Sequence, residues 1–523
     1  MNDRWRRVSE SPTRVNPQSA GRPLTTSDLF AEGGGEKPDL DERLRQAYFW
    51  LVNSAVISPF YDVQFSADAP LNFPVGDAGA TLQLGTDQSY SSNVLLPLLT
   101  FAVGGRCLLV GGPGRGKTTL AVLMGVLAGS TPRVVRRNVL QGQPQLTISD
   151  IVGSPLPKDL IEASDLTGIK VAWRTWLSQP VKIVDEYNRI PTKTQSALLT
   201  MVAEGYVESY DQILETAPAG GIESWYFTAN DDSGGGTFPV IQALRDRMDV
   251  TVAALGFNSR FFDELVARVE AGDRPEDNVP PELVFAGEDR AAIAAQIRAT
   301  ELPTLVRRQL EFFSSHFEFV QHGGRRFEYR TKDTVTTAGG SVSEVIDSNT
   351  GADLEADLGA QTVTSISVRA LQTLILYSKA MAWFRGESAV TVADVSAVLP
   401  FVLRGKLLPN ATHPRFDGGI DRELASDSIA WIGDLFEQSN RQFASLGLAN
   451  GDVVGDQLAL LAKGLDGLKK VDVSRRITTV ETAIATLSKS RKLYGRHYDD
   501  LLALKYLHQR YSNYLRWLES AGK

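Results

Sequence analysis

Cysteine is nearly absent from this chain of 523 residues, because Cys107 is the only one. A single cysteine excludes an intramolecular disulfide and indicates a reducing compartment. Histidine is also scarce, and the five residues are scattered without an H-E-x-x-H pattern or a cysteine partner. The usual protein-bound zinc sites are therefore not expected. We expect Cys107, which lies inside an apolar segment, to be a small buried residue rather than a nucleophile.

Long apolar runs are missing as well. No stretch approaches the ~20 apolar residues of a membrane span, and the N-terminus lacks the apolar region of a secretory signal. The net charge of −8 argues against a protein that coats nucleic acid or membrane by bulk charge. With 43 % hydrophobic and 22 % charged residues, the composition is ordinary for globular proteins. We expect a cytoplasmic protein with several domains.

The apolar pattern divides the chain into five parts. Between about residues 91 and 255, apolar strands alternate with amphipathic helices, which predicts an α/β fold with a parallel sheet and crossover helices. The five parts are a flexible N-terminal arm over 1–40, a partly helical extension over 41–95, an α/β core over 96–255, a helical region over 256–410 with a β-hairpin and loop insert over 317–362, and a C-terminal helical domain over 411–523.

Residues 111–118 read GGPGRGKT, which fits the phosphate-loop pattern G-x-x-x-x-G-K-[ST]. An apolar strand precedes it and a helix follows, which is the context that the motif requires. The glycines let backbone N–H groups approach phosphates, and the helix N-terminus adds its positive dipole end. We expect Lys117 to reach the β- and γ-phosphates and Thr118 to bind Mg²⁺. The predicted nucleotide contacts are Gly111, Gly112, Pro113, Gly114, Arg115, Gly116, Lys117, Thr118 and Thr119.

Two further strands end in polar residues. VKIVDE over 181–186 ends in Asp185, predicted to hold magnesium, and Glu186, predicted to polarise the attacking water as a general base. A second acid at this place is typical of ATPases that hydrolyse with water. YFTAN ends in Asn230, which would orient the same water. An asparagine in an ordinary strand-ending turn is the equally open alternative.

Arginines follow the last predicted strand-helix unit. The segment LRDRMD contains Arg245 and Arg247. An arginine at this place can point into the nucleotide site of a neighbouring subunit, as a finger supplied in trans. Surface ion pairing is the ordinary alternative for such a residue.

Four separated blocks together resemble the MoxR-type AAA+ ATPases, which are related to magnesium-chelatase ATPase subunits. The central block, VDEYNRIPTKTQSALLTMVAEG over 184–205, is similar to their D-E-x-N-R-x-P-x-K-x-Q pattern. The other blocks lie over 140–154, 238–249 and 366–407, in the order that the family has. The resemblance implies an AAA+ αβα core with an α-helical lid over 256–410, ATP and Mg²⁺ as cofactors, and a homo-oligomer, most simply a hexameric ring.

The resemblance also implies roles for single residues. Asp185 and Glu186 would form the Walker B pair, and Asn230 would be sensor 1. Arg247 matches the arginine of the family's D-R-F element and is the favoured trans finger, with Arg245 as the alternative. Arg369 would be sensor 2, an arginine that reaches the γ-phosphate from the lid.

The resemblance favours one function and leaves two alternatives open. MoxR-type proteins are associated with chaperone-like remodelling of protein partners, including partners with von Willebrand factor A domains. The first alternative is a nucleic-acid motor of a restriction or defence system, because basic and aromatic residues interleave over 489–519. The same stretch also has helical apolar spacing, which favours a helical bundle with aromatic core residues. The second alternative is a nucleotide-gated scaffold with little turnover, which the intact acidic pair at 185–186 disfavours.

Overall fold

The computed structural model describes most of the chain beyond the N-terminal arm. Almost all of the predicted arm, and most of the loop within the 317–362 insert, lie outside the described residues. The described residues are 39–57, 60–76, 80–162, 169–217, 221–230, 238, 240–254, 256–272, 274–317, 319–322, 325–328, 358–416, 418, 420–449, 451–489 and 496–521. None of the helices in these ranges is long and apolar enough to cross a membrane.

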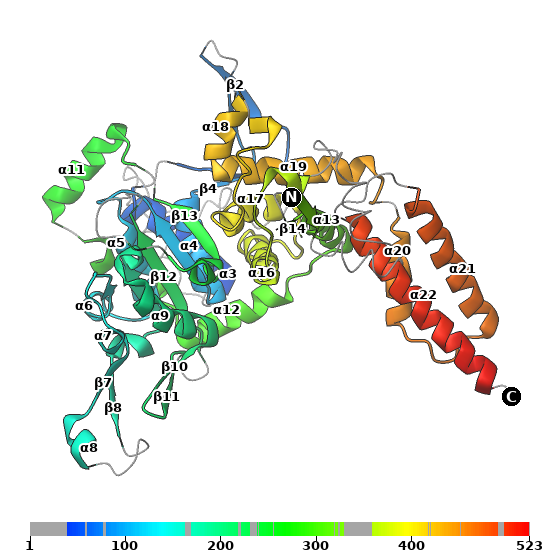
Figure 1. Cartoon of the computed structure of the whole chain (residues 1–523). Helices are drawn as coiled ribbons and strands as arrows, with labels where there is room; N and C mark the ends of the chain where they lie inside the picture. Colours follow the sequence, from blue (N-terminus) through cyan, green and yellow to red (C-terminus); the bar gives the residue numbers. More distant parts are fainter. Residues whose placement is uncertain are drawn as a thin grey trace.

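A parallel sheet of five strands forms the centre of the core (Figure 1). Its order is β13-β5-β12-β9-β6, and all neighbours run parallel. The strands are β5 (Arg106–Val110), β6 (Leu140–Gln141), β9 (Val181–Asp185), β12 (Ser224–Ala229) and β13 (Val250–Ala253). This confirms the predicted parallel sheet. All five carboxyl ends lie at one edge, which is where α/β sheets place their ligands.

Helices cover both faces of the sheet, and side chains alternate between two cores along each strand. On β5, Cys107 and Leu109 face one core, whereas Leu108 faces the other. The first core includes residues of α4, α5, α16 and α17, and the second includes residues of α7 and α9. The core helices are α4 (Ser92–Val103), α5 (Lys117–Leu127), α6 (Pro132–Arg137), α7 (Ile148–Val152), α8 (Pro157–Glu162), α9 (Thr192–Glu204), α10 (Gln242–Asp246) and α11 (Phe262–Ala271).

Two antiparallel hairpins extend from the core on the same side (Figure 1). One consists of β7 (Gly153–Pro155) and β8 (Val171–Trp173), with α8 beyond them. The other consists of β10 (Tyr206–Ser209) and β11 (Gln212–Glu215). The first follows α7 and the second follows α9, and both carry exposed apolar side chains, including Ile161 and Ile213.

The extension before the core contains both helix and strands. Its helix α3 (Leu40–Trp50) continues into a short π-helical turn, η2 (Leu51–Ala55). The segment without a clear apolar period forms β1 (Val63–Phe65), β2 (Leu71–Val75), β3 (Ala80–Leu84) and β4 (Gln88–Tyr90), paired as β1-β4 and β2-β3.

The lid region packs beside α3 and α4. Its helices are α12 (Gly287–Ala299), α13 (Thr304–Ser315), α16 (Val368–Phe384) and α17 (Val392–Leu403). Helices α12 and α13 are separate, because Pro303 has no N–H to donate and restricts the residue before it. The predicted hairpin is confirmed by β14 (Phe319–His322) and β15 (Arg325–Glu328), in which His322 is paired with Arg325.

The C-terminal region is helical, as predicted. It contains α18 (Ile420–Ser426), α19 (Ser428–Ser445), α20 (Val453–Ala462), α21 (Lys470–Leu487) and α22 (Arg496–Ala521). Helices α20, α21 and α22 stand away from the core (Figure 1) and share a small core of their own that includes Val480 and Tyr511. The burial of Tyr511 supports the helical-bundle interpretation of this stretch over base stacking. Tyr506 and Trp517 on the same helix are exposed.

Candidate nucleotide-binding site

The phosphate-loop segment connects the carboxyl end of β5 to the N-terminus of α5. Gly111, Gly114 and Gly116 have φ values of 152°, 71° and 72°, in the region that L side chains rarely adopt. A Cβ at Gly111 would lie 2.7 Å from the carbonyl oxygen of Ala254, which follows the neighbouring strand β13. The loop therefore needs glycine at these positions for its backbone course, and it leads directly into the helix N-terminus.

Lys117 is the first residue of α5, and it is 8 % exposed. Its ammonium group donates to the carbonyl oxygen of Gly112 at 2.8 Å and to that of Gly111. It also donates to Oδ1 of Asn230 at 3.0 Å. The positive charge is thus held in the concave side of the loop, where phosphate oxygens can replace the carbonyl acceptors.

Asp185, at the end of β9, lies against the hydroxyl of Thr118. Oγ1 of Thr118 donates to Oδ1 of Asp185 at 2.9 Å. Thr228, on the neighbouring strand β12, donates to the same carboxylate oxygen. A hydroxyl and a carboxylate side by side are the hard oxygen ligands that Mg²⁺ prefers. The two predicted metal ligands are therefore adjacent, and their chemistry fits the metal.

Glu186 follows Asp185 in a left-handed conformation, with φ of 52°, which is uncommon for a residue other than glycine. Its backbone N–H donates to Oγ1 of Thr228 at 2.9 Å. Its carboxylate accepts from Nδ2 of Asn230 at 3.0 Å and pairs with Nε of Arg189 at 3.1 Å. The structure therefore brings Lys117, Glu186 and Asn230 into one connected group.

Two residues of this group were not singled out from the sequence. Thr228 lies two positions before Asn230 in YFTAN, so period two along a strand places both on one face. Arg189 follows Glu186 by three positions in DEYNR, within the block that carries the family resemblance. In each case, the sequence spacing from a predicted site residue could have identified the additional residue.

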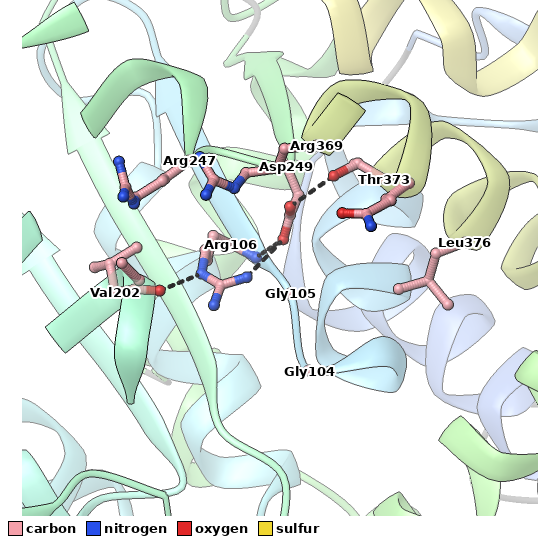
Figure 2. Close-up of a pocket in the computed structure, with 11 residues that line it drawn as sticks. Gly104, Gly105, Arg106, Val202, Arg247, Asp249, Arg369, Thr373 and Leu376 are labelled. Atoms are coloured by element: carbon pink, nitrogen blue, oxygen red, sulfur yellow. Dashed lines mark hydrogen bonds and ion pairs between the residues drawn. The ribbon is translucent and has the colours of Figure 1, made fainter. Parts of the chain in front are cut away.

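The arginines Arg247 and Arg369 lie elsewhere, around a pocket of about 230 Å³ (Figure 2). The charged residues that line this pocket are Arg106, Arg247, Asp249 and Arg369. Arg106 begins β5 and Asp249 directly precedes β13, so the pocket lies at the amino edge of the sheet. Arg245, the alternative finger, is exposed and is not among the residues lining the pocket.

The group of Lys117, Glu186 and Asn230 lies at the carboxyl edge of the sheet, whereas the arginine pocket lies at its amino edge. Arg106 and Val110 are the first and last of the five residues of β5, so at ~3.3 Å per residue Arg106 lies roughly 13 Å from the end of the strand where the phosphate loop begins. The predicted sensor 2 residue, Arg369, therefore does not join its own chain's phosphate loop in this structure. It instead pairs with Asp246, with 3.2 Å between NH1 and Oδ2.

Two carboxylates attach the lid helix α16 to this edge of the core. Asp246 accepts from the hydroxyl of Ser367 at 2.9 Å, in addition to its ion pair with Arg369. Asp249 accepts from the hydroxyl of Thr373 at 3.0 Å (Figure 2). The N-terminal end of α16 is therefore bonded to both ends of the four-residue segment 246–249, which contains Arg247.

Asp249 and Lys406 complete the charges at this junction. Asp249 also accepts from the backbone N–H of Arg106 at 2.8 Å. Lys406 places its amine in a buried position, where none of the described residues forms a hydrogen bond with it. Burial lowers the pKa of Lys406 to about 8, although the neighbouring Asp249 and Asp246 favour its charged form.

Part of this chain matches a known protein family. Residues 357–426, which include α16, α17 and α18, match the AAA lid domain family. No curated protein matches the chain. The chain is similar to a crystal structure of a candidate ATPase from Cytophaga hutchinsonii ATCC 33406, with 19 % identity and a TM-score of 0.45 over 65 % of this chain and 88 % of that one. The parallel-sheet core and the matched lid domain give this chain the AAA+ fold and support an AAA+ ATPase.

Proposed function

We propose that this chain is a Mg²⁺-dependent ATPase that works as an oligomeric ring of the MoxR type and remodels a protein partner. The observation that carries the hydrolytic part is the connected group at the carboxyl edge of the sheet. Lys117, Asn230 and Glu186 are joined by hydrogen bonds of 3.0 Å, and Thr118 lies 2.9 Å from Asp185 beside them. These are a phosphate cation, a water-orienting amide, a general base and a metal-binding pair.

Each residue has a defined task in this proposal. Lys117 binds the β- and γ-phosphates, and Thr118 and Asp185 hold the Mg²⁺, which would neutralise developing charge on the phosphates. Glu186 accepts a proton from the attacking water, and Asn230 fixes the orientation of that water and of Glu186. The ion pair with Arg189, with 3.1 Å between Nε and Oε2, holds the carboxylate of Glu186 in position beside Asn230.

The placement of Arg247 and Arg369 supports a site shared between two copies. Neither arginine reaches its own phosphate loop, because the length of the sheet separates them. A second copy that places its arginine pocket against this phosphate loop would supply both positive charges to the same nucleotide. We therefore propose that Arg247 acts as the finger and Arg369 as sensor 2, both in trans.

The proposed action on proteins rests on the resemblance and on the two hairpins. The β7-β8 hairpin with α8 exposes Leu160 and Ile161, and the β10-β11 hairpin exposes Tyr210 and Ile213. Exposed apolar side chains on protruding elements are suited to binding other proteins. A partner with a von Willebrand factor A domain is the class that the MoxR resemblance favours.

Replacement of the general base tests the enzymatic proposal. Glu186→Gln keeps the size of the side chain and removes its ability to take a proton, so steady-state ATP hydrolysis should fall at least 100-fold, within the range of general-base effects. ATP binding, measured by isothermal titration calorimetry, should persist. Glu519→Gln, at an exposed position on α22, is the matched control. Equal, negligible rates in wild type and Glu186→Gln, with ATP still bound, would favour the scaffold alternative.

A further inference from the structure

Helix α11 has an apolar stripe that is exposed along its whole length, although Arg268 of the same helix donates to the carbonyl oxygen of Ala55 at 2.7 Å. Phe262, Leu265, Val266 and Val269 follow the i, i+3, i+4, i+7 spacing of an amphipathic helix, and none of the residues of α11 is buried. Val269 is 72 % exposed and Phe262 is 58 % exposed. Helices with such a stripe normally bury it. Figure 1 shows α11 standing off from the rest of the core.

The chain leads from the phosphate-loop edge of the sheet into α11. The carbonyl oxygen of Ala254, which directly follows β13, accepts from NH1 of Arg115 in the phosphate loop at 3.2 Å. Helix α11 begins at Phe262, eight residues later. A second copy that covers this phosphate loop therefore approaches the part of the core that carries α11.

A second exposed apolar patch lies next to the arginine pocket. It consists of Val363, Val368 and Leu408, which are 47 %, 70 % and 41 % exposed. The backbone N–H of Val363 donates to the carbonyl oxygen of Leu408 at 3.0 Å, so these two residues are adjacent. Val368 is the first residue of α16 and directly precedes Arg369. We call these three residues the lid patch.

The charges around the two apolar surfaces are complementary. Helix α11 carries Asp263, Glu264 and Glu270 against one arginine, Arg268, which is already paired with Glu264. The pocket beside the lid patch is lined by three arginines and one carboxylate. A negative helix and a positive pocket favour approach of these two surfaces and disfavour pairing of either surface with itself.

We propose that the apolar stripe of α11 docks on the lid patch of a second copy of this chain, in a head-to-tail interface. This inference rests on the proposed shared site, because the same approach brings Arg247 and Arg369 of one copy to the phosphate loop of the next. The interface is heterologous: the two contacting surfaces differ, so repetition of the contact builds a ring or an arc.

Cysteine cross-linking tests the pairing directly. Burial strongly raises the pKa of the Cys107 thiol, so the natural cysteine is a poor background nucleophile. Val269→Cys and Val368→Cys are made in separate full-length chains, mixed with ATP and Mg²⁺, and treated with a short bismaleimide. The mixture should give a cross-linked dimer, whereas each variant alone should not. Val471→Cys, at a valine that is 69 % exposed on α21, replaces Val269→Cys in the control mixture.

A dimer from the control mixture at the same yield, or no dimer from the test mixture, overturns the docking proposal. The ATPase rate of the cross-linker-free mixture is measured beside it and decides the proposed function separately. If the mixture hydrolyses ATP but gives no cross-linked dimer, the proposed ATPase activity stands and the proposed interface is wrong.

A charge substitution provides a second measurement. Val269→Asp places a carboxylate in the stripe, and the dissociation constant for self-association, measured by analytical ultracentrifugation, should rise at least tenfold. Val471→Asp should leave it unchanged. Circular dichroism of both variants monitors folding. An unchanged dissociation constant for a folded Val269→Asp protein contradicts the proposal.

Discussion

Lys406 places its ammonium group at the junction of core and lid, where charges of both signs meet. The amine is buried, Asp249 and Asp246 favour its positive charge, and Arg369 opposes it. Burial is the largest effect, and it lowers the pKa of Lys406 from 10.5 to about 8. The folded protein therefore holds this proton less tightly than the unfolded chain does.

This difference predicts a pH dependence of stability. Below about pH 8 the lysine is charged in both states, so the folded state carries the full cost of its burial. Between pH 8 and pH 10.5 the unfolded chain binds more protons at this site, so the stability of the wild type rises relative to that of Lys406→Met. We expect Lys406→Met to be more stable at pH 7, by the order of 2 kcal/mol, and the difference to shrink toward pH 10.5.

Urea unfolding at a series of pH values measures this difference. Lys463→Met, at an exposed lysine that ends α20, is the control substitution. A Lys406→Met protein whose stability relative to the wild type is constant across the series would show that Lys406 does not titrate differently in the two states.

At the scale of the elements, the attachment of α16 to the core depends on Asp249. Its carboxylate accepts from the hydroxyl of Thr373 at 3.0 Å and from the backbone N–H of Arg106 at 2.8 Å. Asp249→Ala leaves both donors without this acceptor in a buried place, which costs about 1–3 kcal/mol for each unsatisfied group. We expect the free energy of unfolding to fall by about 2–4 kcal/mol.

Denaturant unfolding checks this value, with Asp466→Ala, at an exposed position between α20 and α21, as the matched control. A surface substitution of that kind is expected to change stability by less than about 0.5 kcal/mol. A loss for Asp249→Ala no larger than that of the control would contradict a structural role for this carboxylate.

The elements that the sequence predicts best are those set by local pattern. The strand before Gly111, the helix after Lys117 and the strand that ends in Asp185 each have their own period and boundary residues, and all three are present. Asn230 and Glu186 are in direct contact because neighbouring parallel strands end at one edge of the sheet. These predictions needed no knowledge of long-range packing.

Local sequence patterns of this kind do not predict where the lid lies relative to the core. The expectation for Arg369 placed it at the γ-phosphate from the lid, but did not state which copy would receive it. Its position depends on Asp246 and Asp249, which bond to α16 across more than 100 positions of sequence. Bonds over that separation leave no periodic signal, because each partner is an ordinary polar residue at a helix or strand end.

At the scale of the whole molecule, complementation between inactive variants tests the shared site. Lys117→Ala removes the phosphate cation, and Arg247→Ala removes the proposed finger, so each variant alone should hydrolyse ATP poorly. In an equal mixture, about a quarter of the head-to-tail interfaces join an intact phosphate loop to an intact arginine. Hydrolysis should therefore recover to a corresponding fraction of the wild-type rate, measured with a coupled phosphate assay.

A second mixture controls this measurement. Lys117→Ala mixed with Lys117→Ala,Arg247→Ala should show no recovery, since no interface has both halves. Absence of recovery in the first mixture, with mixed assemblies demonstrated by native mass spectrometry, would place Arg247 outside the shared site.

Because Lys117 and Arg247 lie at opposite edges of one sheet, the number of complete nucleotide sites depends on whether the assembly is open or closed. If each site needs one edge from each of two copies, an open arc of n copies contains n − 1 complete sites, and the copies at its two ends each carry an unused half. Closure joins those halves and adds one site without adding a subunit. Turnover per subunit would then report whether the assembly has closed, so an event that opens a single contact would silence one site and leave the others intact.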